Sequence, residues 1–301
     1  NHALTTMPTG GFSTYDSSVG HFDSYTVELI IILFMFIGGI NFTLLWFIRE
    51  GQFKKASQDE EFKNYLVYIF TTFLFITIAL LVTRDYTTTD SFIDSLFTVV
   101  SLGTSTGYTS TDYMQWPVFT HLLLFVLMIV GACAGSTSGG LKLMRINLAF
   151  KVAMRELVRI AQPRKVQKIR LNNQVVGDQQ IGLIVGMLFV WIGLFAISSI
   201  ILSLMIPGED FESILALVAS SLGNTGPTLG NYGPTQTWAG LNSGALIGTS
   251  ILMWFGRLEL LTAVILLHPH TWKSESKDQT NRGALSRLRR MISREPIDES
   301  K

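Results

Sequence analysis

The sequence is poor in charge and almost without cysteine. Asp, Glu, Lys and Arg make up 15% of its 301 residues, 48% are hydrophobic, and the mean hydropathy is +0.37. This composition is not that of an ordinary soluble domain and indicates a membrane protein. The single cysteine, Cys133, excludes an internal disulfide and a cysteine-based metal site. The histidines show no metal-ligand spacing and are interpreted as interfacial: His2, His21, His121, His268 and His270.

Five apolar segments are long enough, or nearly long enough, to cross a membrane. A helix needs about 20 residues to cross roughly 30 Å of hydrocarbon. We therefore expect spanning helices at residues 29–48, 65–83, 118–134, 181–206 and 241–267.

Basic residues are nearly absent from every second connection between these segments. Of the 23 Lys and Arg residues, 21 lie in residues 49–63, 142–170 and 273–301. The positive-inside rule assigns these three segments, and with them the C-terminus, to the cytoplasm. The opposite connections carry Arg84 as their only basic residue and ten acidic ones. An outer face with this charge would concentrate cations.

A short motif rich in Gly, Ser and Thr occurs three times. It is found around Thr9-Gly10, Thr106-Gly107 and Thr225-Gly226, and the last two copies follow apolar segments of about half the spanning length, residues 92–102 and 211–222. Alignment on the Thr-Gly pair puts Gly10, Gly107 and Gly226 in register, at spacings of 97 and 119 residues. Such recurrence suggests duplicated units.

Helices of half the spanning length can enter a membrane but cannot cross it. The backbone of the loop that follows is tolerated at membrane depth only where protein surrounds it or where it lines a water-filled cavity. Three such loops can converge on one axis, where backbone carbonyls replace the water around a cation. We predict that the carbonyls of residues 7–11, 104–108 and 223–227 do so. The alternative is a set of ordinary extracellular loops.

Two further features interrupt the apolar pattern. Residues 131–140 contain four glycines and should break the helix that begins at Val118, either as unwound backbone beside a cavity or as a tight contact of small residues. An amphipathic helix is expected beyond it, at residues 141–161. Arg257 lies within the last apolar segment, where a buried charge is costly and by default marks a functional pathway. We expect it to point to the cavity and to carbonyls of residues 131–140. The alternative is a purely structural pairing with a polar group on another helix.

Enzymatic activity is not expected. Residues 103–107 match the nucleophile-elbow pattern, but a membrane helix precedes them where a strand is required. Residues 135–142 have the wrong spacing for a phosphate loop. The remaining alternative of another class is a membrane scaffold subunit without a filter.

The three Thr-Gly loops and Gly256-Arg257-Leu258-Glu259 resemble the Trk/Ktr/HKT superfamily of potassium transporters, most closely the bacterial TrkH type. The resemblance covers residues 1 to about 270. It implies an all-α membrane protein in which four units, each of helix, re-entrant pore-helix and helix, surround a pseudo-fourfold pore. Each unit contributes one filter strand with a key glycine.

The resemblance assigns this chain to the second, third and fourth units. Residues 1–62 would be the end of the second unit with its filter loop, inner helix and cytoplasmic link. Residues 63–177 would be the third unit with an interrupted inner helix and a basic cytoplasmic segment, 178–270 the fourth unit, and 271–301 a basic cytoplasmic tail. The chain opens at Asn1 without methionine and lacks a first unit, so we expect it to be the C-terminal portion of a longer protein.

Function and site residues follow from the same resemblance. It implies uptake of potassium, the transported substrate, across a bacterial cytoplasmic (inner) membrane without a covalently bound cofactor; a transporter permeable to sodium and potassium is the alternative. The implied filter residues are Thr9, Gly10, Gly11, Thr104, Ser105, Thr106, Gly107, Tyr108, Asn224, Thr225, Gly226 and Pro227, with potassium at Thr9, Gly10, Thr106, Gly107, Thr225 and Gly226. The implied gate residues are Gly131, Gly135, Ser136, Gly139, Gly140 and Arg257.

The resemblance also implies partners. These are a second copy of the chain, forming a homodimer, and a cytoplasmic nucleotide-binding regulatory subunit of the TrkA type. The basic residues of 141–170 and 282–294 would meet that subunit or anionic lipid headgroups.

Overall fold

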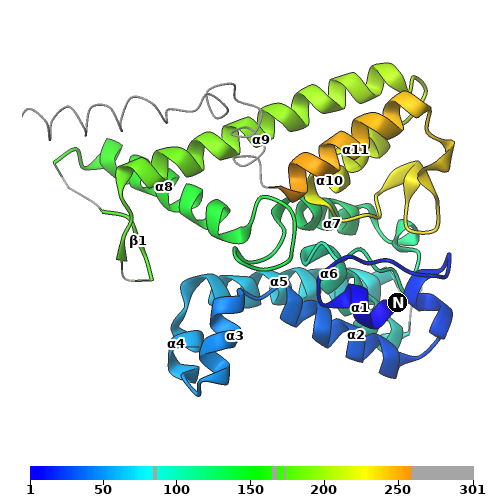
Figure 1. Cartoon of the computed structure of the whole chain (residues 1–301), viewed down its shortest axis with the longest axis horizontal. Coiled ribbons are helices and arrows are strands. Elements are labelled where there is room, and N and C mark those ends of the chain that lie inside the picture. Colours follow the sequence, from blue (N-terminus) through cyan, green and yellow to red (C-terminus); the bar gives the residue numbers. More distant parts are fainter. Residues whose placement is uncertain (84–86, 165–167, 173, 259–301) are drawn as a thin grey trace, which may run out of the picture. The chain divides into compact units, whose positions relative to one another are not determined.

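The computed structural model describes residues 1–83, 87–164, 168–172 and 174–258, and this part of the chain is mainly helical (Figure 1). Within it, two helices are long and apolar enough to cross a membrane, α5 (Glu60–Thr83) and α9 (Asp178–Met205). The pair α2 (Tyr25–Gly38) and α3 (Phe42–Arg49) counts as a third if it is taken as one bent span. The fold class predicted from the sequence, an all-α membrane protein, is confirmed apart from one short hairpin.

The predicted span at residues 29–48 is broken instead of continuous. Its two helices, α2 and α3, meet at 102°. Asn41 begins the second helix, because its side chain caps the backbone N–H of Thr43 at 2.9 Å. The prediction of one straight helix was wrong because it followed the apolar composition and overlooked this capping residue.

The short apolar helices also differ from their predicted bounds. α6 (Thr88–Gly103) starts before the predicted residue 92, because the hydroxyl of Thr87 caps the backbone N–H of Asp90 at 3.2 Å. α7 (Val118–Val130) ends before the predicted residue 134, since Gly131 takes a φ of 69°. α10 (Phe211–Gly223) agrees with the prediction to within one residue.

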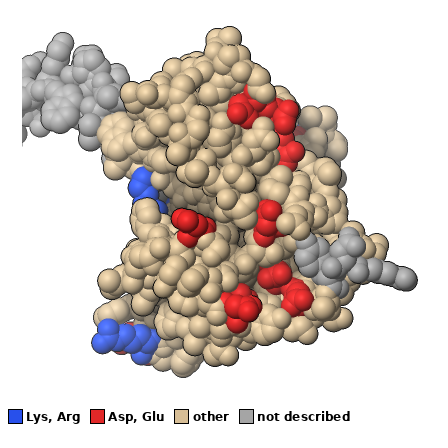
Figure 2. All heavy atoms as spheres, turned by 90° about the vertical axis from the view of Figure 1, so that its right-hand side faces the viewer, with Lys and Arg blue, Asp and Glu red and all other residues tan. Residues whose placement is uncertain are grey.

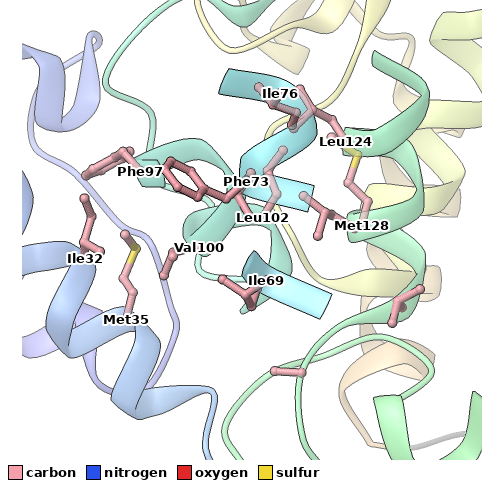
Figure 3. Packing of buried hydrophobic residues seen from close by; sticks show 14 of the residues in the cluster. Ile32, Met35, Ile69, Phe73, Ile76, Phe97, Val100, Leu102, Leu124 and Met128 are labelled. Carbon is pink, nitrogen blue, oxygen red and sulfur yellow. The ribbon is translucent and has the colours of Figure 1, made fainter. Parts of the chain in front are cut away.

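α6 lies at the centre of the main hydrophobic core. Figure 3 shows how its residues pack against three other helices: Phe97, Val100 and Leu102 of α6 lie among Ile32 and Met35 of α2, Ile69, Phe73 and Ile76 of α5, and Leu124 and Met128 of α7. By contrast, large apolar side chains such as Phe70 of α5 and Phe189 of α9 are exposed. Exposed apolar surface of this extent fits contact with lipid.

A second core joins α9, α10 and α11 (Ser243–Arg257). The predicted span at residues 241–267 is described only as far as residue 258, so the basic tail, Glu259, His268 and His270 lie outside the described residues. The predicted amphipathic helix is α8 (Leu143–Ala161), two residues shorter at its start. The remaining elements are α1 (His2–Thr6), α4 (Phe53–Gln58), the strands β1 (Arg170–Leu171) and β2 (Gln174–Val175), and single turns of 3-10 helix at Ser18–Phe22, Tyr113–Gln115, Gly230–Tyr232 and Trp238–Gly240.

The two described basic segments lie at the same end of the molecule. α4, α8 and β1, which carry them, are at the left of Figure 1, whereas the N-terminus and the loop after α10 are at the right. This arrangement agrees with the alternation of charge along the sequence.

Candidate functional site

Three loops with the same backbone path follow α1, α6 and α10. In each, a residue other than glycine has a positive φ, and a glycine two residues later has one too: Thr9 (52°) and Gly11 (64°), Ser105 (54°) and Gly107 (81°), Asn224 (53°) and Gly226 (100°). A positive φ is uncommon outside glycine, and for a β-branched residue it is an outlier. Its recurrence at three places means that the loops share one geometry.

The hydrogen bonds of the loops correct the register deduced from the sequence. A backbone N–H donates to the carbonyl five residues earlier in each loop: Gly10 to Thr5 at 2.8 Å, Thr106 to Ser101 at 2.9 Å and Thr225 to Ser220 at 3.0 Å. Gly11, not Gly10, is therefore equivalent to Gly107 and Gly226, and the spacings are 96 and 119 residues. The alignment was wrong by one because Gly10 occupies the position of a threonine in the other loops.

Neighbouring loops touch through these glycines. A Cβ atom added to Gly11 would overlap the carbonyl of Thr106, and one added to Gly107 would overlap the carbonyl of Thr225. Within the part of the chain that the structure describes, a Cβ atom on Gly226 would meet nothing within 4 Å. The three loops thus follow one another in space in their sequence order, each pressed backbone to backbone against the next.

Two tyrosines add hydrogen bonds between the loops. The hydroxyl of Tyr108 lies 2.6 Å from the hydroxyl of Thr5, and that of Tyr113 donates to the carbonyl of Thr228 at 2.8 Å. Both tyrosines are buried. Each therefore fixes the middle loop to one of its neighbours.

Sequence reasoning missed the hydroxyl that supports each loop from its helix. The three residues share a position six before the loop glycine: Thr5 donates to the Phe12 carbonyl at 3.1 Å, Ser101 donates to the Tyr108 carbonyl at 2.6 Å, and Ser220 accepts from the Gly226 N–H at 3.0 Å. A Ser or Thr six residues before a recurring glycine is the signal that would have revealed them.

The segment of residues 131–142, named here the crossing segment, is not helical and contacts all three loops or the helix ends before them. Each contact comes from a different residue: Thr137 Oγ1 donates to the Met7 carbonyl at 3.1 Å, Ser138 Oγ lies 3.3 Å from Ser105 Oγ, and a Cβ atom on Gly139 would overlap the Gly223 carbonyl. The predicted interruption of the helix is therefore present.

Positive φ angles at three glycines shape the crossing segment. They are 69° at Gly131, 71° at Gly135 and 77° at Gly140. The hydroxyl of Ser136 donates to the carbonyl of Cys133 at 2.6 Å and closes a turn that contains Gly135.

The crossing segment also exchanges backbone hydrogen bonds with the break between α2 and α3. The N–H of Cys133 donates to the carbonyl of Gly39 at 3.2 Å, and the N–H of Phe42 donates to the carbonyl of Gly135 at 3.1 Å. Each interruption therefore supplies partners for backbone groups that a regular helix would have satisfied within itself.

Arg257 reaches both the crossing segment and the first loop. Its guanidinium donates to the carbonyl of Thr137 at 2.9 Å and to the carbonyl of Pro8 at 3.4 Å. The contact with a carbonyl of residues 131–140 agrees with the prediction, but the predicted burial of the charge does not: Arg257 is exposed and is the last residue of α11. The burial was predicted from the apolar residues on both sides of Arg257. Those residues indicate that the segment contacts lipid, but they do not determine the direction of the Arg257 side chain.

The opposite end of the molecule is acidic. Figure 2 shows this face, with Asp and Glu spread over it and Lys and Arg visible only at its left edge. His121, interpreted from the sequence as interfacial, is enclosed by protein. The residue is 8% exposed, its Nε2 lies 3.1 Å from the Tyr113 carbonyl oxygen, and its Nδ1 lies 3.4 Å from the Glu212 carboxylate.

Asp94 in α6, which is not one of the spanning helices, gives this end a pH dependence. Burial raises the pKa of Asp94 to about 6, the charge of Asp90 adds to the rise, and the hydrogen bond from Ser110 opposes it. The unfolded chain loses this proton near pH 4. Unfolding therefore releases a proton between about pH 4 and 6, so stability falls as the pH rises through that window and stays lower above it.

Replacement of Asp94 by asparagine is expected to reduce that fall. The unfolding temperature of the purified full-length protein at pH 7.5 should rise by about 2 °C or more. Asp16→Asn, at an exposed acid of the same end, is the matched control for the loss of one carboxylate, and its unfolding temperature at pH 7.5 should stay near that of the original protein. An Asp94→Asn variant with the original slope between pH 4 and 6 would contradict the assignment.

Known proteins resemble this chain over most of its length. The family model described as "TrkH: Cation transport protein" matches residues 1–274. The Trk system potassium uptake protein TrkH of Vibrio parahaemolyticus is 36% identical over 278 residues, which cover 91% of this chain and 56% of that protein. The Trk system potassium uptake protein TrkG of Escherichia coli K12 is 31% identical over 275 residues, with coverages of 91% and 56%.

A solved structure agrees as well. The crystal structure of the potassium transporter TrkH from Vibrio parahaemolyticus superposes with a TM-score of 0.83 at 35% identity, covering 90% of this chain and 58% of that one. The chain thus spans a little over half the length of these relatives, which are named as transporters and not as enzymes. The match to the family model includes the three loops, the crossing segment and Arg257, and the chain belongs to the TrkH family of cation transport proteins.

Proposed function

We propose that the protein takes up potassium across the membrane through a filter to which the three loops contribute. The observation that carries the proposal is the shared backbone geometry of the loops, which lie side by side at the ends of helices with the crossing segment against all three. The names of the relatives, potassium uptake proteins, support the choice of cargo.

Backbone oxygens would supply the ion site. Alternation of positive and negative φ lets successive carbonyls point to one side. A filter requires this arrangement, because its carbonyl oxygens replace the hydration water of the ion. The C-terminal ends of α6 and α10 add partial negative charge at the start of their loops. The hydroxyl oxygen of Thr225 supports the same assignment, because it is buried and has no hydrogen-bond partner among the described residues.

The crossing segment and Arg257 would form the gate. Thr137 is held through its hydroxyl and through the guanidinium of Arg257, so this part of the segment lies against the first loop. A positive charge beside the ion path impedes a cation electrostatically.

The proposed transporter lies in a membrane with a defined orientation. Residues 1–62, 63–177 and 178–270 would be successive pore units in a bacterial inner membrane, with the basic segments and the C-terminus in the cytoplasm. A homodimer regulated by a cytoplasmic nucleotide-binding subunit is the assembly we expect. Sodium is the alternative cargo.

Rubidium uptake into proteoliposomes that contain the full-length protein tests the function. Uptake should exceed that of empty vesicles, and external potassium should compete with it more strongly than sodium does. Equal competition by the two ions would favour the sodium-permeable alternative. Uptake no greater than in empty vesicles would favour a scaffold without a filter.

Neutralisation of Arg257 is expected to raise this uptake. The Arg257→Gln variant keeps a donor for the Thr137 carbonyl but removes the charge, and rubidium uptake should rise by about tenfold, the effect of roughly 1.4 kcal/mol on a barrier. Arg257→Lys retains the charge and is the matched control, with uptake near that of the original protein. A fall in uptake for Arg257→Gln would show that the arginine assists ion passage.

A further inference from the structure

Glu61, near the start of α5, joins three parts of the molecule. The residue is 6% exposed. Its Oε1 accepts a hydrogen bond from the backbone N–H of Ala134 at 2.5 Å, and the backbone N–H of Met144 also bonds to its carboxyl group. Ala134 belongs to the crossing segment and Met144 to the first turn of α8. One carboxylate therefore connects α5 with both.

The start of α8 needs such an acceptor. The first N–H groups of a helix have no partner within the helix, and Lys142, at the N-cap of α8, provides no side-chain cap. Glu61 supplies the missing acceptor from another helix, and its charge suits the positive end of the helix dipole. Hydrogen bonds to an ionised acceptor are about twice as strong as neutral ones.

A buried cation accompanies this carboxylate. Lys142 is 4% exposed, its ammonium group donates to the carbonyl of Ser138, and it attracts Glu61 electrostatically, whereas Asp59 repels it. The crossing segment is thus held at Ala134 by Glu61 and at Ser138 by Lys142.

We propose that Glu61 is a positioning residue that holds the crossing segment against the three loops, so that loss of its charge releases the segment and opens the ion path. The second half of this statement rests on the proposed function. The first half does not, because it concerns only the position of residues 131–142.

Glu60 provides a matched control. It neighbours Glu61 and also joins α5 to α8, through an ion pair with Lys151, but none of its described contacts reaches the crossing segment. A general loosening between α5 and α8 would therefore affect Glu60 and Glu61 variants alike.

Cys133 reports the position of the crossing segment directly. It is the only cysteine of the sequence, it is fully buried, and it precedes Ala134. We would measure the rate at which a membrane-permeable maleimide labels Cys133 in the full-length protein, by peptide mass spectrometry, for Glu61→Gln, Glu61→Asp and Glu60→Gln. Rubidium uptake would be measured on the same preparations.

Glu61→Gln should label about tenfold faster, because it loses one charge-assisted interaction. Glu61→Asp, which keeps the charge on a shorter side chain, should lie between it and the original protein, and Glu60→Gln should match the original. If the Glu61→Gln protein cannot be recovered in a folded form, the labelling rate of Glu61→Asp tests the proposal instead. Basal rubidium uptake should rise in the same order.

Unchanged labelling in the Glu61 variants would overturn the proposal, as would equal acceleration in Glu60→Gln. Faster labelling with unchanged rubidium uptake, in a protein that transports rubidium, would overturn the release of the ion path. Absence of rubidium uptake in the original protein would refute the proposed function, while the labelling rates would still decide the role of Glu61.

Discussion

Gly107→Ala is expected to abolish rubidium uptake. The added methyl group would overlap the Thr225 carbonyl and approach Pro227 Cδ to 2.9 Å, and the φ of 81° strains any residue with a side chain. Overpacking of a rigid site costs about 1–3 kcal/mol, and a left-handed φ adds about 1 kcal/mol. Together these costs correspond to a loss of about a hundredfold or more.

The control for this variant is Gly182→Ala. Gly182 lies in α9, and a Cβ atom there would meet no atom of the described residues within 4 Å, so uptake should stay unchanged. Size-exclusion chromatography of both purified proteins separates a filter defect from misfolding. Normal uptake in a folded Gly107→Ala protein would mean that ions do not pass the contact between the second and third loops.

Gly11→Ala and Gly10→Ala are expected to differ sharply although the residues are adjacent. A methyl group on Gly11 would overlap the Thr106 carbonyl, at a φ of 64°. A methyl group on Gly10 would meet the Phe12 side chain at 3.3 Å, and that ring can move. Rubidium uptake should fall about a hundredfold for Gly11→Ala and by less than about threefold for Gly10→Ala.

This pair tests the corrected register of the loops. Each variant is the control for the other, since both change the same loop by one methyl group. The reverse order, with Gly10→Ala inactive and Gly11→Ala active, would support the alignment on the Thr-Gly pair and contradict the equivalence of Gly11, Gly107 and Gly226.

The sequence was sufficient to predict the loops but not their register. Recurrence of the Thr-Gly pair identified all three sites, and short apolar segments precede the last two of them. At the first of them two glycines are adjacent, and residue type alone favours Gly10. The choice depends on backbone angles, and Thr9 adopts a φ that a β-branched residue rarely takes. The same loop meets the second loop at Gly11, a tertiary contact that residue type does not encode.

Glu61 shows why part of the site was out of reach of the sequence. It is one of three consecutive acids with Asp59 and Glu60, and nothing in the local pattern marks it as the buried one. Its partner Ala134 is 73 residues away in the chain. Hydrophobic periodicity predicts which helices exist, whereas the identity of a buried acid depends on how distant segments meet.

The mutual hydrogen bonds between the α2–α3 break and the crossing segment constrain how this architecture can change. If residues 39–41 became regular helix, Cys133 would lose its acceptor and Gly135 its donor. At membrane depth each orphaned backbone group costs several kcal/mol. Substitutions that made one of the two segments a regular helix would remove hydrogen-bond partners from the other segment. The two irregular stretches have to be kept together or replaced together.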